Sequence, residues 1–97
     1  MNEKLFDFYK PEKTKTFDDN FKKLTKKDKV LADRIKRKIR DICEYPERGE
    51  PLSRNFAGKW SIHVAGHYVI LYKIIHEDNV VRLLSVRHHD YAYGKKV

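Results

Sequence analysis

The sequence predicts an α+β fold in which a two-helix hairpin packs on a curled, mostly antiparallel sheet of about four strands. Three observations lead to this prediction. Apolar residues recur at helical spacing between residues 17 and 43, alternation with a period of two begins at residue 60, and a short aromatic segment precedes the helices. The expected order is strand, helix, helix and three strands, in a single domain spanning residues 1–97.

The first expected strand is Lys4–Tyr9, which is rich in aromatic and apolar residues and is ended by Pro11. Thr16 is a good N-cap for the first helix, because Asp18 and Asp19 then fall in the first turn, where the helix dipole favours acids. The apolar face of this helix consists of Phe17, Phe21 and Leu24.

The second helix is predicted from a capping pattern and a long apolar stripe. Thr25 and Asp28 form a relaxed capping box, and Pro46 limits the helix to about Glu44. Cys43 falls on the apolar side, where we expect a small core residue. The stripe consists of Leu31, Ile35, Ile39 and Ile42.

Three strands follow. In Trp60–Val64 apolar residues alternate with polar ones, and Gly66 breaks the run. Tyr68–Ile75 is almost wholly apolar, which is typical of a central strand covered on both faces. A turn at residues 77–79 leads to a last strand over Val80–Arg87.

Charge is unevenly distributed along the chain. Residues 10–40 contain thirteen Lys or Arg and five Asp or Glu, so this segment alone accounts for the net charge of +8. A basic lobe of this kind favours a polyanionic or an acidic protein partner, although a solvated helix face gives the same pattern.

Several classes of protein are disfavoured. A single cysteine excludes an intramolecular disulfide, and no apolar run is long enough to cross a membrane. The N-terminal residues have no signal-peptide pattern, so we expect a cytoplasmic protein. No metal site or small-molecule cofactor is expected, because the sequence has no HExxH, CxxC or glycine-rich phosphate loop and because adjacent His88 and His89 would point to opposite sides of a strand.

A carboxylate and several histidines in the second half are candidates for acid–base chemistry on a phosphodiester. Glu50 precedes a proline, His63 lies opposite the apolar face of its strand, and His88 and His89 follow the last strand. Each of them, taken alone, is also compatible with an ordinary surface residue.

The second half also resembles a known family. Gly49–Leu52 (GEPL) and Asn55–Ser61 (NFAGKWS) are similar to a stretch of the YoeB branch of the RelE/ParE toxin superfamily. His63 followed by Tyr68–Lys73 (YVILYK), with His89 and the pair Tyr93-Gly94 at the end, resembles the YafQ branch.

The resemblance implies a RelE-like fold and a toxin that cleaves messenger RNA in the ribosomal A site. It implies a metal-independent reaction in which the 2′-hydroxyl attacks the adjacent phosphate, with a general base, cations for the phosphate and a general acid. The implied partners are a cognate antitoxin, the ribosome and mRNA, with no membrane and no cofactor.

Roles follow from matched positions. By resemblance Glu50 matches the glutamate that serves as base in the YoeB branch, and His63 matches a strand histidine that is important in the YafQ branch. His89 matches the terminal histidine of both branches and is the candidate acid. Arg87 would bind the phosphate and Tyr93 would stack on a base. This chain has Val69 at the position where YoeB has an arginine, and His67 at the position where YafQ has an aspartate. The identity of the general base therefore remains open between Glu50 and a histidine. RNA contacts are expected from Arg54, Lys59, His67 and His88.

Two alternatives remain. One is a ParE-type toxin that disables gyrase without cutting RNA and generally lacks the His/Glu set. The other is a basic RNA-binding module without catalysis.

Overall fold

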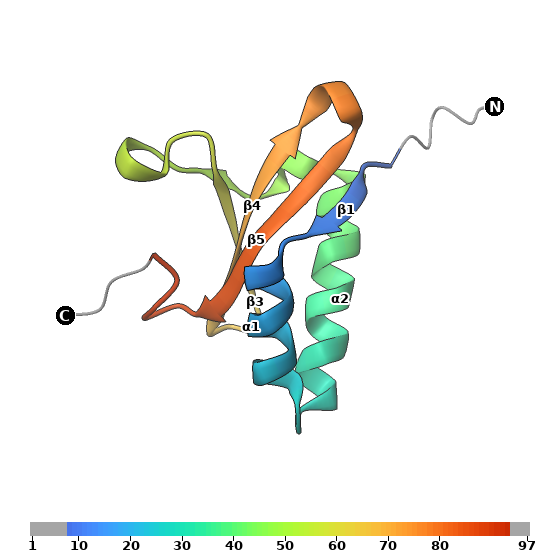
Figure 1. The fold of residues 1–97 in the computed structure, drawn as a ribbon, viewed down its shortest axis with the longest axis vertical. Helices are drawn as coiled ribbons and strands as arrows, with labels where there is room; N and C mark the ends of the chain where they lie inside the picture. Colours follow the sequence, from blue (N-terminus) through green and yellow to red (C-terminus); the bar gives the residue numbers. More distant parts are fainter. Residues whose placement is uncertain (1–7, 94–97) are drawn as a thin grey trace.

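The computed structural model describes residues 8–93 and contains two helices packed on one face of a five-stranded sheet (Figure 1). The strands lie in the order β1-β5-β4-β3-β2, with β1 parallel to β5 and the other pairs antiparallel. The strands are β1 Lys10–Lys13, β2 Glu50–Pro51, β3 Trp60–Val64, β4 Tyr68–Ile75 and β5 Val80–His88. The α+β class and the antiparallel meander β3-β4-β5 are therefore confirmed, and β4 is the central strand as predicted.

The first strand differs from the prediction. Most of Lys4–Tyr9 lies outside the described residues, and Phe8 and Tyr9 belong to no strand. The strand instead occupies Lys10–Lys13, where the Lys10 N–H donates to the carbonyl of Asn79 at 2.8 Å. Pro11 is accommodated because β1 is an edge strand, where a missing N–H can face away from the sheet.

Both helices begin at caps other than those expected. Helix α1 spans Lys15–Thr25, and its N-cap is Thr14, whose hydroxyl accepts the Phe17 N–H, rather than Thr16. Helix α2 spans Lys29–Glu44, and Asp28 alone caps it by accepting the Leu31 N–H at 3.0 Å. The predicted end of α2 at Glu44 is confirmed. Short 3₁₀ turns occupy Pro46–Arg48, Arg54–Phe56 and His76–Asp78.

The main core lies between the helices and the sheet. Phe17, Ile35 and Tyr72 are at most 1% exposed, and the predicted core residues Leu31 and Ile42 are also buried. Ile39 and Trp60 are only partly buried and pack against this core, as side chains at its margin. Cys43 is buried as predicted, and burial raises the pKa of its thiol to about 11.

A smaller apolar cluster covers part of the opposite face of the sheet. Val69 and Leu71 of β4 pack there against Leu52, Phe56 and the buried Ala92. These contacts bring the β2–β3 loop and the C-terminal turn over the face that carries no helix. We call this helix-free side the open face. No helix within residues 8–93 is both long and apolar enough to cross a membrane.

Candidate active site

Strand register places three of the predicted site residues on the open face. Glu50 of β2 is paired with Ser61, and two residues further along β3 His63 is paired with Val69. Val69 is in turn paired with Arg87 of β5. Paired residues share a face of a sheet, and Val69 packs in the open-face cluster, so Glu50, His63 and Arg87 share that face.

The same register sets their spacing. Glu50 and His63 are diagonal neighbours, which lie about 7–8 Å apart in an antiparallel pair. His63 and Arg87 are separated by two strand spacings, or about 10 Å. Within residues 8–93 no side-chain hydrogen bond or ion pair engages Glu50 or His63, and both are exposed. Both groups are therefore available to a bound molecule.

The backbone before Glu50 is anchored to the central strand. The hydroxyl of Tyr72 donates to the carbonyl of Pro46 at 2.7 Å and accepts the N–H of Gly49 at 3.2 Å. A Cβ on Gly49 would lie 2.4 Å from the Ser61 carbonyl oxygen and 2.5 Å from the Tyr72 hydroxyl, which explains the glycine. Burial is also the main cause that raises the pKa of Tyr72 to about 12.

Arg87 lies at the margin of the open face. Its Nε is 3.5 Å from Oδ1 of Asn20 in α1, and the same oxygen accepts the Val86 N–H at 3.1 Å. A surface cavity of about 490 Å³ adjoins these residues. Its lining also includes Lys23, Leu24, His88 and Tyr91. The Nε of Arg87 thus contacts α1, and Lys23 lines the same cavity.

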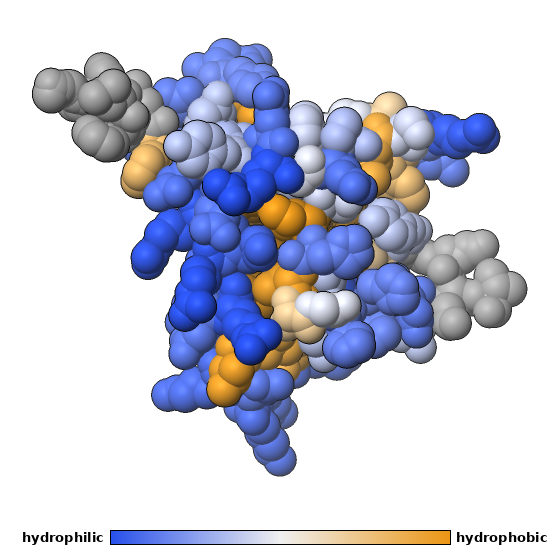
Figure 2. All heavy atoms as spheres, turned by 180° about the vertical axis from the view of Figure 1, so that it is seen from behind, coloured by the Kyte–Doolittle hydropathy of each residue, from blue (hydrophilic) through white to orange (hydrophobic). Residues whose placement is uncertain are grey.

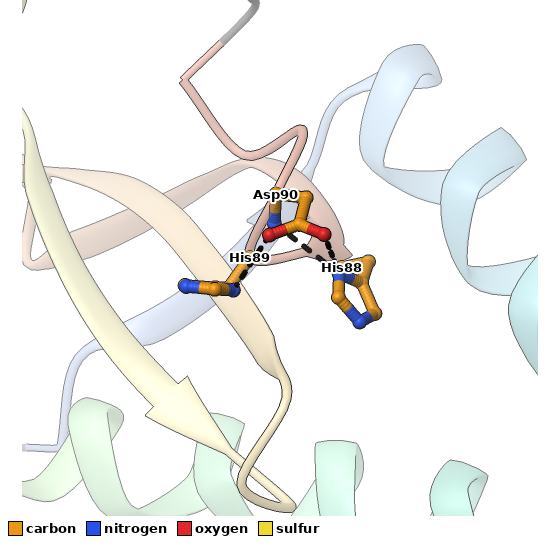
Figure 3. Close-up of side chains that lie close together, drawn as sticks. All are labelled: His88, His89 and Asp90. Carbon is orange, nitrogen blue, oxygen red and sulfur yellow. Dashed lines mark hydrogen bonds and ion pairs between the residues drawn. The ribbon is translucent and has the colours of Figure 1, made fainter. Parts of the chain in front are cut away.

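His89 and His88 lie on either side of the Asp90 carboxylate (Figure 3). His89 Nδ1 is 3.3 Å from Asp90 Oδ1, and His88 Nδ1 is 3.7 Å from Oδ2. The Asp90 N–H donates to His88 Nδ1 at 3.2 Å, so this nitrogen carries a lone pair. Ligand atoms of the three residues lie within 4.8 Å of one another. The expectation that the two histidines point apart is therefore wrong, because the strand ends at His88 and the chain turns back.

His67 joins this end of the sheet to the β3–β4 turn. Its carbonyl accepts the His89 N–H at 2.8 Å, and its ring is parallel to that of His88, with centroids 6.1 Å apart. The edge of Tyr68 also contacts His88 at 5.7 Å between centroids. His67, His88, His89 and Asp90 are called the histidine cluster below.

The β2–β3 loop supplies the remaining predicted residues. Phe56 packs edge-to-face on Tyr93 at 5.5 Å, and the Lys59 ammonium lies 5.4 Å from the Phe56 ring centre. Arg54 is exposed, and its backbone φ is +56°, a left-handed conformation that residues other than glycine seldom adopt. The loop thus holds two cations and an aromatic pair near the C-terminal turn. Gly94 lies outside the described residues.

Sequence reasoning missed three residues that shape this region. Asn20 contacts Arg87, Asp90 lies between the two histidines, and Tyr72 holds the Glu50 segment. The sequence did offer a clue for Asp90, because an acidic residue directly after two histidines at the end of a strand can reach their rings when the chain turns. Asn20 and Tyr72 act across 67 and 23 residues of sequence, respectively, and have no local signal.

A second surface feature is a groove that lies along helix α2. A groove of about 250 Å³ runs between α2 and the end of β3, and its lining includes Arg34, Arg37, Lys38 and Asp41 beside Val64 and Ala65. Viewed from behind, the molecule exposes a band of apolar side chains bordered by strongly hydrophilic ones (Figure 2). An apolar strip beside cations suits an amphipathic, acidic segment.

Comparison with known proteins gives consistent matches. Residues 12–93 match the family described as the ParE toxin of the type II toxin–antitoxin system parDE. An uncharacterized protein of Methanosarcina mazei is 33% identical over 76 residues, which cover 78% of this chain and 88% of that protein.

Two solved structures show the same fold. One is the toxin–antitoxin complex RelBE2 from Mycobacterium tuberculosis, at 33% identity and a TM-score of 0.73, covering 84% of this chain and 91% of the matched chain. The other is a YoeB/ParE toxin from Agrobacterium tumefaciens, at 23% identity and a TM-score of 0.75, covering 82% and 98%.

Proposed function

The chain belongs to the ParE toxin family of type II toxin–antitoxin systems, within the RelE/ParE superfamily, and we propose that it is a ribosome-dependent endoribonuclease that cleaves mRNA. The observation that carries this proposal is the register that gathers Glu50, His63 and Arg87 on the open face, with His89 in the turn directly after β5.

The spacing of these groups suits in-line attack on a phosphodiester. A base and an acid must reach opposite sides of one phosphorus, and cations must lie beside its oxygens. Glu50 and His63 occupy adjacent strands, whereas Arg87 belongs to β5, on the other side of β4, and His89 directly follows that strand. The phosphate would therefore lie over β4, between the two groups.

In the proposed reaction Glu50, or His63 in its place, accepts the proton of the 2′-hydroxyl. The 2′-oxygen attacks phosphorus, and the bond from phosphorus to the 5′-oxygen breaks. His89 gives its proton to the departing 5′-oxygen. The products are a 2′,3′-cyclic phosphate and a 5′-hydroxyl, and Arg87 with Arg54 or Lys59 stabilises the phosphorane charge.

The aromatic pair supports RNA binding. Tyr93 is partly exposed and is held by Phe56, and His88 contacts Tyr68 and Tyr91. Exposed aromatic rings on a basic protein offer stacking surfaces for unpaired bases. We assign Tyr93 to stacking beside the cleaved bond, and Arg54, Lys59, His67 and His88 to further RNA contacts.

We assign the basic helices to contacts with partner molecules. Ribosomal RNA is a polyanion, and the segment 10–40 carries the net charge of the chain. A cognate antitoxin with an acidic, amphipathic segment would fit the groove between α2 and β3, where three cations adjoin apolar side chains. The site of action would be the cytoplasm, where translating ribosomes are found.

A ParE-type toxin that acts on gyrase is the second candidate, because the family that matches residues 12–93 carries the ParE name. The two candidates predict different products. Programmed ribosomes are incubated with the purified protein and the 5′ ends of the mRNA are mapped, while gyrase supercoiling is assayed with the same preparation. New 5′ ends that require ribosomes support the nuclease, and intact mRNA with blocked supercoiling supports the alternative.

A further inference from the structure

We propose that His88, His89 and Asp90 together bind one Zn²⁺ ion, and that the bound ion inhibits RNA cleavage. The second half of this proposal rests on the nuclease function proposed above, whereas the first half does not. The ion is a reversible inhibitor here and takes no part in the reaction.

The geometry is close to that of a zinc site. Zinc bonds to imidazole nitrogen and carboxylate oxygen are about 2.0–2.2 Å long, so two ligand atoms of a tetrahedral site lie about 3.3–3.6 Å apart. The contact between His89 Nδ1 and Asp90 Oδ1 is 3.3 Å, and that between His88 Nδ1 and Asp90 Oδ2 is 3.7 Å. All three ligand atoms lie within 4.8 Å of one another (Figure 3). The two nitrogens approach different oxygens of the Asp90 carboxylate, so zinc binding requires the rings to rotate until both nitrogens face one metal position.

The fold holds these ligands together before any ion arrives. The chain turns directly after β5, with the Tyr91 N–H donating to the carbonyl of His88 at 2.9 Å. Three residues after His89, the turn is anchored by the buried Ala92, which packs on Val69 and Leu71. The His89 N–H is fixed by the His67 carbonyl, and the His88 ring by the parallel His67 ring. Binding would therefore order few additional groups.

His88 Nδ1 is in a suitable state, and all three ligand groups are accessible. His88 Nδ1 accepts the Asp90 N–H, so it already presents the lone pair that a metal requires. Zinc would replace this one hydrogen bond. The side chains of His88, His89 and Asp90 are 41%, 57% and 46% exposed, which gives an ion a path from solvent and leaves a fourth position for water.

The ligand chemistry selects the metal. Two imidazoles and one carboxylate suit Zn²⁺, whereas Mg²⁺ prefers oxygen ligands and keeps much of its water. The magnesium that ribosomes require should therefore not occupy this site. With zinc bound at Nδ1 the ring cannot take up a second proton, so His89 could no longer form the imidazolium that gives its proton to the leaving oxygen.

Calorimetric titration of untagged, metal-free protein with ZnCl₂ tests the site directly. We expect one ion per chain, at least a tenfold loss of affinity in Asp90→Asn and in His88→Ala, and wild-type affinity in His76→Ala, which removes a histidine from the opposite end of the sheet. Excess MgCl₂ should not displace the zinc. Thermal unfolding of each variant in EDTA checks the fold. Wild-type binding in both Asp90→Asn and His88→Ala, or no binding by the native protein, would overturn the proposal.

Cleavage with and without zinc tests the second half. On programmed ribosomes, zinc should slow cleavage by the wild type at least tenfold and cleavage by Asp90→Asn at most twofold. Zinc binding by a protein that cuts no RNA would defeat the proposed function and leave the site standing. Cleavage that is indifferent to zinc, at concentrations that fill the site, would defeat the inhibition alone.

Discussion

The hydroxyl group of Tyr72 lies 3.2 Å from the backbone nitrogen of Gly49 and accepts its hydrogen bond across 23 residues of sequence. The same hydroxyl donates to the carbonyl of Pro46 at 2.7 Å. One side chain of the central strand thus fixes the segment that delivers Glu50 to the open face.

Replacing Tyr72 by Phe should therefore destabilise the protein. Both backbone groups lose their partner in a part-buried environment, and an unsatisfied buried group costs about 1–3 kcal/mol. Urea unfolding followed by circular dichroism measures the change. The control is Tyr45→Phe, because Tyr45 is 62% exposed and its hydroxyl makes no hydrogen bond within residues 8–93. Equal stability of the two variants would show that the hydroxyl of Tyr72 contributes nothing.

The stability of the fold should fall at alkaline pH. Folding raises the pKa of Cys43 from 9.0 to about 11 and that of Tyr72 from 10.0 to about 12. The unfolded chain therefore loses these protons at lower pH than the folded one, and ionisation favours unfolding as pH rises from about 9 to 12. The free energy of unfolding should decline less steeply in Cys43→Ala and Tyr72→Phe than in the wild type. Identical slopes in all three proteins would contradict this account.

Ile35 should be among the most sensitive core positions. It is fully buried between α2 and the sheet, so Ile35→Ala removes apolar contacts and leaves a cavity, at a cost of about 2–5 kcal/mol. Val30→Ala is the matched control on the same helix, because Val30 is 64% exposed and its truncation should change stability by less than about 0.5 kcal/mol. Chemical denaturation of both variants gives the comparison.

Association with the cognate antitoxin should depend on salt. The association rate is expected to fall as ionic strength rises, because the screening length shortens to about 3 Å at 1 M. Arg34→Glu and Arg37→Glu should slow association more than Arg48→Glu, which makes the same charge change beyond the end of α2. Stopped-flow or surface-based kinetics measure these rates. A rate that is unaffected by both salt and the α2 variants would rule out electrostatic steering.

Local pattern was sufficient to predict the helices and the three long strands. Apolar residues that recur at intervals of about four predicted the ends of α2 to within a few residues. The apolar run of β4 was predicted with its observed bounds, Tyr68–Ile75. These elements carry their signal within their own residues, because each buries one or both of its faces.

Elements defined by distant partners were not predictable in the same way. Strand β1 is formed by Lys10–Lys13, which has no strand-like pattern, because it pairs with β5 about 70 residues later. The two-residue β2 exists only through its pairing with Trp60 and Ser61. The alternation of β3 did place His63 opposite the apolar set, but the contact of Arg87 with Asn20 depends on how α1 packs beside β5.

The histidine pair illustrates the limit of a strand rule. Adjacent residues point to opposite faces only while the strand continues, and β5 ends at His88. The turn that follows allows Asp90 to reach both rings, which no periodicity in the sequence indicates.

The central claim is that acid–base residues on and beside the open face cut mRNA, and single-turnover cleavage on programmed ribosomes tests it most directly. His89→Ala should lower the rate about 10²–10⁴-fold, since that is the usual contribution of a general acid or base. Glu50→Gln and His63→Ala should also be slow, and Arg87→Lys should retain part of the rate that Arg87→Ala loses. The control is His76→Ala, an exposed histidine of the β4–β5 turn, which should cleave like the wild type. Each variant is first shown to be folded and to bind ribosomes, and wild-type cleavage by His89→Ala would contradict the account.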